Sequence, residues 1–374
     1  MNENDTAWVA LNLVPGLQPA RAIRLAEALG GADGVFRADP ARLRAIRGLS
    51  PETVHNIVTF PWRSKANDEI TQSNNRKFHI LTYASDLYPA RLRNIPDPPP
   101  VLYVHGELLP GDDLCVGVVG SRSPSPYGLG AAADLGRDLA RRGVTVVSGM
   151  AKGADSAAHQ GALDGGGRTV AVLGSGLDVP YPRRNRRLME RIARRGAAVS
   201  EFPLGTRPAP WNFPRRNRVI AGMTLGTVVI EAAARSGSLI TAELALEGGR
   251  EVFAVPGRVT SPRSEGTNSL IRDGARLARS AADVIDDLPA EWRERARPEP
   301  RSLDPRLVAG LDEGETRVLA QLDPDEPMLV DALARDVGLP HGRLLDALLS
   351  LEMRRLVRAV PGGRYMRTSE ARGR

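Results

Sequence analysis

Apolar residues follow a strand-and-helix rhythm in the middle of the chain. Short runs rich in β-branched residues predict strands at residues 114–119, 144–148, 169–173, 197–201, 227–231 and 251–255. Between them, helical spacing predicts helices at residues 129–142, 155–163, 185–195, 216–223 and 239–247. Apolar strands that alternate with helices of this length form a parallel sheet covered on both faces. We therefore expect a Rossmann-like, doubly wound, mostly parallel α/β domain that binds its ligand beyond the carboxyl ends of the strands.

The N-terminal residues follow a helical pattern instead. Two similar hydrophobic-glycine turns, at residues 13–17 and 46–50, each precede an amphipathic run. Pro51 suits the first turn of the second helix, with Ser50 as its cap. The two turns resemble helix-hairpin-helix elements, whose glycine turns present backbone N–H groups to DNA phosphates. An ordinary helical packing module is the alternative interpretation of the same pattern.

A charged, proline-rich stretch near residue 289 predicts a linker. Beyond it, residues 315–322, 328–337 and 341–352 predict three helices, and residues 356–366 predict a hairpin with a Pro-Gly-Gly turn. Three helices with such a hairpin form a winged helix. We therefore divide the chain into a helical SAM/helix-hairpin-helix-like domain (1–72), a Rossmann-like domain (78–288), a linker (289–308) and a winged-helix domain (309–368).

The composition indicates a polyanionic partner. The net charge is +7, and only Lys65, Lys77 and Lys152 of the 51 basic residues are lysines. Such a charge favours polyanions without choosing nucleic acid over membrane, and arginine binds phosphates through a planar, bidentate fork. We see no signal peptide and no run of about 18 apolar residues. These features predict a cytoplasmic protein that does not span a membrane.

The loops after the predicted strands contain the candidate binding residues. Gly120 lies where a strand turns towards a helix, so a phosphate can meet bare backbone N–H groups there. Arg122 adds a guanidinium fork, although it can instead pair with a carboxylate of its own domain. Neither a dinucleotide fingerprint nor a Walker lysine motif is present.

Two further loops, at residues 181–187 and 211–218, place an aromatic beside a proline and then arginines around an asparagine. Arginines can neutralise phosphates while an aromatic ring stacks on an unpaired base. In the last loop, we expect Ser238 to cap a helix whose N–H groups can face an anion. The candidate DNA-binding residues of all these loops are Gly120, Ser121, Arg122, Gly149, Lys152, Arg183, Asn185, Phe213, Arg215, Arg216, Asn217, Arg218, Ser236, Gly237 and Ser238.

Asp155 and His159 are four residues apart on a predicted helix and can face each other. A catalytic pair needs a nucleophile or a metal, and neither is evident. We therefore interpret Asp155 as a helix cap and His159 as a hydrogen-bonded packing residue. We expect no catalytic residue, metal or cofactor.

In their order, the loops resemble the DNA-processing protein A (DprA/Smf) family. The resemblance rests on residues 88–92, 97–103, 120–122, 148–151, 174–178, 213–222, 236–242 and 253–257, and it extends over more than half of the chain. It implies a non-catalytic homodimer that binds single-stranded DNA and helps load the RecA recombinase past single-strand-binding protein. The process is natural transformation or recombinational repair. Arg122 and Arg183 match DNA-contacting positions, and Phe213 matches a position placed against bases.

Two alternatives from other classes of protein stay open. The segment that ends at Glu231 is similar to the glycine-threonine-glutamate segment of Rossmann-like nucleoside-monophosphate phosphoribohydrolases, although Glu231 can instead satisfy arginines or backbone N–H groups. The winged helix also allows a sequence-specific regulator. Its third helix carries Arg343 beside Asp346 and Glu352, a poor face for groove reading. We therefore expect the terminal domains to make auxiliary contacts with duplex DNA or with a partner.

Overall fold

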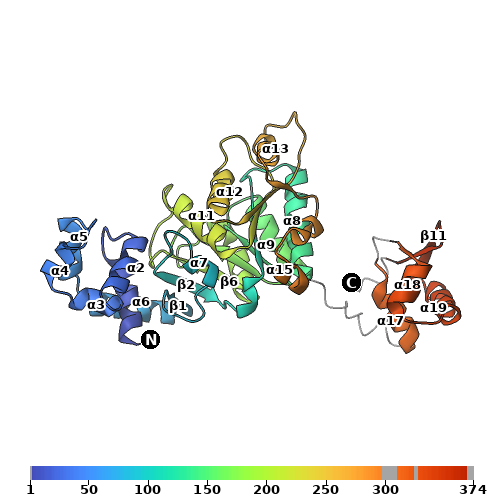
Figure 1. Cartoon of the computed structure of the whole chain (residues 1–374), viewed down its shortest axis with the longest axis horizontal. Coiled ribbons are helices and arrows are strands. Elements are labelled where there is room, and N and C mark those ends of the chain that lie inside the picture. Colours follow the sequence, from blue (N-terminus) through green and yellow to red (C-terminus); the bar gives the residue numbers. More distant parts are fainter. Residues whose placement is uncertain (1, 297–309, 324–326, 369–374) are drawn as a thin grey trace. The chain divides into compact units, whose positions relative to one another are not determined.

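The computed structural model describes residues 2–296, 310–323 and 327–368. The chain forms two compact units, residues 1–297 and 298–374 (Figure 1). Across the described ranges, no helix has both the length and the apolar character needed to cross a membrane.

The first part of unit 1 is helical, as predicted. Its helices are α1 (Glu3–Leu13), α2 (Pro19–Ala28), α3 (Ala32–Arg37), α4 (Pro40–Arg44), α5 (Pro51–Thr59) and α6 (Trp62–Asn75). Ser50 caps α5 by accepting the N–H of Thr53, which confirms the predicted cap. Gly16 and Gly48, in the two similar turns, both have left-handed backbone, with φ of 76° and 91°.

A nine-stranded sheet organises the rest of unit 1. Its strands are β1 (Phe78–Thr82), β2 (Val101–Gly106), β3 (Cys115–Val119), β4 (Thr145–Ser148), β5 (Thr169–Val172), β6 (Ala197–Ser200), β7 (Gly226–Val229), β8 (Glu251–Ala254) and β9 (Arg276–Leu277). The order is β1-β2-β6-β5-β4-β3-β7-β8-β9. Pairing is parallel from β6 to β9, whereas β2 is antiparallel to both β1 and β6. The predicted strands are β3 to β8, and the predicted fold class is confirmed.

Helices cover both faces of this sheet (Figure 1). They are α7 (Ala90–Arg93), α8 (Pro126–Arg141), α9 (Ala154–Asp164), α10 (Arg186–Ala193), α11 (Asn212–Met223), α12 (Gly237–Glu247), α13 (Glu265–Arg272), α14 (Ala281–Asp286) and α15 (Ala290–Arg295). The helices α8, α9 and α14 pack on one face, and α7, α11 and α12 pack on the other. Alternate residues of β3 and β4 enter the two cores, because successive side chains of a strand point to opposite faces.

The helix α15 occupies the start of the predicted linker. Ala296 is fully buried, and the guanidinium of Arg91 lies 4.3 Å from the ring centroid of Trp292. These residues therefore belong to the packed domain. The remainder of the predicted linker, from residue 297 onward, lies outside the described residues.

Unit 2 is a winged helix, as predicted. It contains α17 (Glu313–Gln321), β10 (Met328–Leu329), α18 (Val330–Val337), α19 (His341–Met353), β11 (Val357–Val360) and β12 (Arg364–Arg367). The three strands form a sheet in the order β10-β12-β11. The exposed face of α19 carries Leu345, Leu349 and Met353, which are 46%, 60% and 80% exposed. Arg343 and Asp346 are exposed on the same helix, and the expectation that this helix reads a groove poorly stays a prediction.

Candidate nucleic-acid interface

The direction of the strand order reverses at β3, which lies between β4 and β7. The chain runs outward from β3 to β6 on one side and continues with β7 and β8 on the other. The loops that leave β3 and β7 therefore part from each other, and such a point is where doubly wound sheets bind ligands. A groove of about 790 Å³ opens here. Its walls are the loops after β3, β4 and β7, the segment before α11, and the start of α12.

Arg216, on α11, lies at the floor of this groove and is only 5% exposed. Its Nη1 donates to the carbonyls of Gly149 and Val172, and its Nε donates to Oδ1 of Asn217 at 3.0 Å. No acceptor for its Nη2 exists among the described residues. Burial lowers the pKa of Arg216 to about 10, and neighbouring Asp155 opposes this shift. The floor of the groove is therefore a cation at neutral pH with one nitrogen unengaged.

Phe213 forms the wall next to this cation. The guanidinium carbons of Arg122 and Arg216 lie 5.0 and 6.0 Å from its ring centroid. The ring of Tyr181 lies 5.8 Å away at an interplanar angle of 47°. Gly174 passes beside the ring, because a Cβ at this position would lie 3.0 Å from it. The cluster combines cations with a half-buried aromatic face, the two chemistries that bind unpaired nucleotides.

Two arginines of the groove are free of carboxylates. Arg122 and Arg235 are exposed, and neither has a hydrogen-bond or ion-pair partner in the part of the chain that the structure describes. The alternative in which Arg122 pairs with a carboxylate of its own domain is therefore not supported. Both guanidiniums are available to an anion.

The backbone near Gly120 corrects one expectation. The N–H of Ser121 donates to the carbonyl of Glu231 at 2.8 Å, and the N–H of Gly120 hydrogen-bonds the carboxylate of Asp155. The predicted bare N–H groups are thus engaged within the protein. Gly149 is also buried, with Arg216 against its carbonyl. At this loop, the group left for a phosphate is the side chain of Arg122.

Asp155 and His159 do not form a pair. The carboxylate of Asp155 accepts the N–H of Ala151 at 3.2 Å, so it fixes the loop before α9, and Gly153 rather than Asp155 is the cap residue. Nδ1 of His159 lies 2.7 Å from Oγ1 of Thr169. Burial lowers the pKa of His159 to about 3, so the ring is neutral at neutral pH. The interpretation of His159 as a hydrogen-bonded packing residue is confirmed.

Glu231 has backbone and hydroxyl partners at the end of β7. Its carboxylate accepts the N–H of Ser125 at 2.8 Å and the hydroxyl of Ser125 at 2.6 Å. It therefore stabilises the start of α8. This is the structural role expected from the sequence as the alternative to a phosphoribohydrolase-like one. Among the described residues, no group of three or more His, Cys, Asp or Glu side chains is arranged to hold a metal ion.

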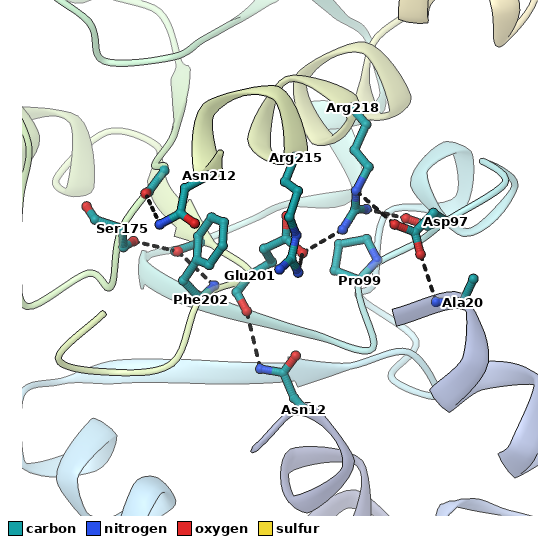
Figure 2. A network of polar contacts seen from close by, with 12 residues as sticks. Asn12, Ala20, Asp97, Pro99, Ser175, Glu201, Phe202, Asn212, Arg215 and Arg218 are labelled. Carbon is teal, nitrogen blue, oxygen red and sulfur yellow. Dashed lines mark hydrogen bonds and ion pairs between the residues drawn. The ribbon is translucent and has the colours of Figure 1, made fainter. Parts of the chain in front are cut away.

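The predicted loop at residues 211–218 is instead the start of α11, which begins at Asn212. Glu201, which follows β6 and is 3% exposed, accepts from Nη2 of Arg215 at 2.9 Å and from Nη2 of Arg218 at 2.5 Å (Figure 2). The side chain of Arg215 stays 44% exposed, whereas that of Arg218 is 11% exposed. Arg218 is thus engaged inside the protein, together with Arg216, and Arg215 is the member of the run that faces solvent.

The same network reaches the N-terminal helices (Figure 2). Arg218 donates to the carbonyl of Asp97, and Oδ1 of Asp97 accepts the N–H of Ala20 on α2 at 2.7 Å. The amide of Asn12 donates to the carbonyl of Glu201 at 3.2 Å. Polar contacts therefore tie α11 to β6 and to both α1 and α2.

The helix α12 begins with a different cap residue from the predicted one. Ser236, not Ser238, is the cap residue, and its hydroxyl accepts the N–H of Ser238. The amide of Asn217 donates to the carbonyl of Gly237 at 3.3 Å, which joins α11 to α12. All four of these residues line the groove.

Arg183, Asn185 and Lys152 lie beside the groove rather than in it. The side-chain amide of Asn185 donates to the carbonyl of Met150 and to the hydroxyl of Ser156, both at 2.8 Å, so it holds two loops together. Arg183 is exposed on the short 3-10 helix η2 (Arg183–Asn185) and has no ion-pair partner among the described residues. Lys152 is exposed and lines a second hollow.

The candidate residues did not include Tyr181 and Arg235, which line the groove. Both lie next to candidate residues in the sequence, so their position beside a strand-end motif was the available signal. The side chain of Trp211, beside the same groove segment, is 72% exposed.

Comparisons with known proteins agree with this architecture. A family model described as DNA recombination-mediator protein A matches residues 79–289, and one described as DprA winged helix domain matches residues 298–363. Protein Smf of Escherichia coli is 40% identical over 328 residues, which are 87% of this chain and 86% of that protein. Protein Smf of Synechocystis is 34% identical over 404 residues, and the match covers 98% of this chain and 99% of that protein.

Two solved structures are similar to the chain. The X-ray structure of DNA processing protein A from Streptococcus pneumoniae has a TM-score of 0.68 at 35% identity and covers 76% of this chain and 98% of its own. A structure of DNA processing protein A from Helicobacter pylori, described for its single-stranded DNA binding mode, has a TM-score of 0.52 at 29% identity. It covers 57% of this chain and 98% of its own.

The Glu201 network generates a stability prediction. Glu201→Gln removes the charge that a buried Arg218 requires, and breaking one side of a buried pair is costly. We expect the free energy of unfolding, measured by denaturant titration, to fall by about 3 kcal/mol. The matched control Glu243→Gln changes an exposed glutamate on α12, and its effect should stay within about 0.5 kcal/mol. Equal stability of the two variants would contradict the role assigned to Glu201.

Proposed function

The chain belongs to the DNA recombination-mediator protein A (DprA/Smf) family, and from that premise we propose that its groove binds and protects single-stranded DNA without catalysing a reaction on it. One observation carries this proposal. The free guanidinium of Arg122 lies over the half-buried ring of Phe213, at the point where the strand order reverses. A phosphate and an unpaired base, offered together only by a single strand, fit this pair.

The roles of the individual residues follow from their environments. We assign phosphate contacts to Arg122, Arg183 and Arg235, which are exposed and have no carboxylate partner among the described residues. Phe213 stacks on a base. Arg216 contributes positive potential from the floor, where burial strengthens electrostatic attraction because the local dielectric constant is low.

We extend the proposal to the process in which the protein works. The family resemblance supports a homodimer that helps load RecA onto single-stranded DNA past single-strand-binding protein, in natural transformation or recombinational repair. Faster assembly of RecA filaments on coated single strands when the protein is present is the expected outcome. The apolar exposed face of α19 supports a contact with a protein partner more than reading of a DNA groove.

The first prediction concerns phosphate contacts. Arg122→Ala and Arg183→Ala should each weaken binding of the full chain to single-stranded DNA. Each should also lower the slope of log affinity against log salt by about 0.7, because one counterion-releasing contact with a single strand is lost. Arg194→Ala is the charge-matched control, since Arg194 is also exposed and lies at the far end of α10. Unchanged affinity and slope in both folded variants, Arg122→Ala and Arg183→Ala, would count against the site.

The second prediction concerns stacking. Phe213→Ala should weaken single-strand binding by about 1–3 kcal/mol with little change in the salt slope, because stacking is not an ionic contact. Phe213→Tyr keeps an aromatic face and should bind nearly as the parent protein does, whereas Phe213→Leu keeps apolar bulk alone and should resemble Phe213→Ala. If Phe213→Ala instead changes the slope and leaves the affinity intact, the ring only positions the arginines.

A further inference from the structure

A second hollow of about 650 Å³ lies on the other side of the loop that carries Arg122. In two loops, one residue lines the groove and the next residue lines the second hollow. Arg122 lines the groove and Ser123 lines the second hollow, and Ala151 and Lys152 divide in the same way. Successive Cα atoms are 3.8 Å apart. The groove and the second hollow therefore share a rim that is about one residue wide.

The second hollow is rich in positive charge. Lys152, Arg184 and Arg263 line it, and no carboxylate is among its described lining residues. Lys152 and Arg184 are exposed and have no hydrogen-bond or ion-pair partner in the described parts of the chain. Nε of Arg263 donates to the carbonyl of Ser123 at 3.1 Å, which leaves its terminal nitrogens towards solvent.

The chemistry of the two cavities differs. The groove contains Phe213 and Tyr181, whereas no aromatic side chain is among the described residues that line the second hollow. Its uncharged polar groups include Gln160 and Asn185. A surface with cations and without a stacking face suits a phosphodiester backbone rather than a base.

We propose that the second hollow binds the phosphodiester backbone of the same DNA strand, next to the nucleotide held in the groove, through Lys152, Arg184 and Arg263. The proposal rests on the function proposed above and extends it from one pocket to a path. The strand crosses the shared rim, with its base stacked on Phe213 on one side and its phosphates neutralised on the other. Each copy of the chain then binds the strand at two adjacent points, so the strand dissociates only when the contacts in the groove and in the second hollow are both broken.

The test is a salt titration of the full chain with a fluorescent oligothymidylate of about sixteen nucleotides, the upper end of the site sizes of OB folds that bind single strands. The triple variant Lys152→Ala, Arg184→Ala, Arg263→Ala should lower the salt slope by about two units, since each single-strand phosphate contact contributes about 0.7. Arg194→Ala, as the control, should leave the slope unchanged. Thermal unfolding of every variant verifies the fold.

A second probe separates a phosphate contact from a disturbed loop. In an oligothymidylate with uncharged methylphosphonate linkages, the triple variant should bind as the parent protein does, because no charge remains for the hollow to neutralise. An equal loss on the charged and uncharged probes would overturn the proposal, since it would indicate that Arg263 merely supports the loop at Ser123.

The outcomes also separate this proposal from the proposed function. The triple variant could keep the slope and affinity of the parent protein while Arg122→Ala lowers both. In that case the second hollow is not a DNA site and the groove remains one. If Arg194→Ala lowers the slope by about a third of the fall seen in the triple variant, the effect is one of net charge and the proposal fails. If neither the triple variant nor Arg122→Ala changes binding, the proposed function itself fails.

Discussion

The groove depends on how the helix α11 is held, because that helix carries Phe213, Arg216 and Asn217. The buried carboxylate of Glu201 accepts from Arg215 and Arg218, on the solvent-facing and inner sides of α11. Its backbone carbonyl accepts from Asn12 of α1. A buried ion pair is weak evidence for stability as such, but it fixes geometry because either partner alone is costly to bury. The orientation of the aromatic wall and the cationic floor therefore depends on a residue outside the groove.

Burial separates the arginines of this region into two groups with different contacts. Arg216 and Arg218 satisfy carbonyls and carboxylates inside the protein, whereas Arg122, Arg183 and Arg235 stay exposed and unpaired within the described residues. In the proposed function, the buried Arg216 serves the site through its charge, which persists at neutral pH and acts across a low-dielectric floor. We propose that the exposed arginines supply the contacts that depend on salt and that the aromatic wall supplies a contact that does not.

Local sequence signals predict much of this arrangement. Apolar periodicity locates β3 to β8, capping chemistry identifies Ser50, and strand order places the ligand site where the groove lies. Features that need distant partners are harder to predict. The sequence gives no sign that Arg216 is engaged, because the carbonyls that accept from it are those of Gly149, directly after β4, and Val172, at the end of β5. The first residues of α11 resemble a loop because their proline and arginines hide the helical period. The strands β1 and β2 escape the prediction because they pair antiparallel, with only the four-residue helix α7 between them, and so form no βαβ unit.

The central claim is that the protein grips an unpaired strand through charge and stacking together. Equilibrium binding of the full chain to a single strand and to a duplex of the same sequence, over a range of salt concentrations, tests it most directly. Tighter binding of the single strand is predicted, with a preference that grows as salt rises, because stacking is not screened and the duplex slope is steeper for each contact. A preference for the duplex, or equal affinities that fall together with salt, would contradict the account.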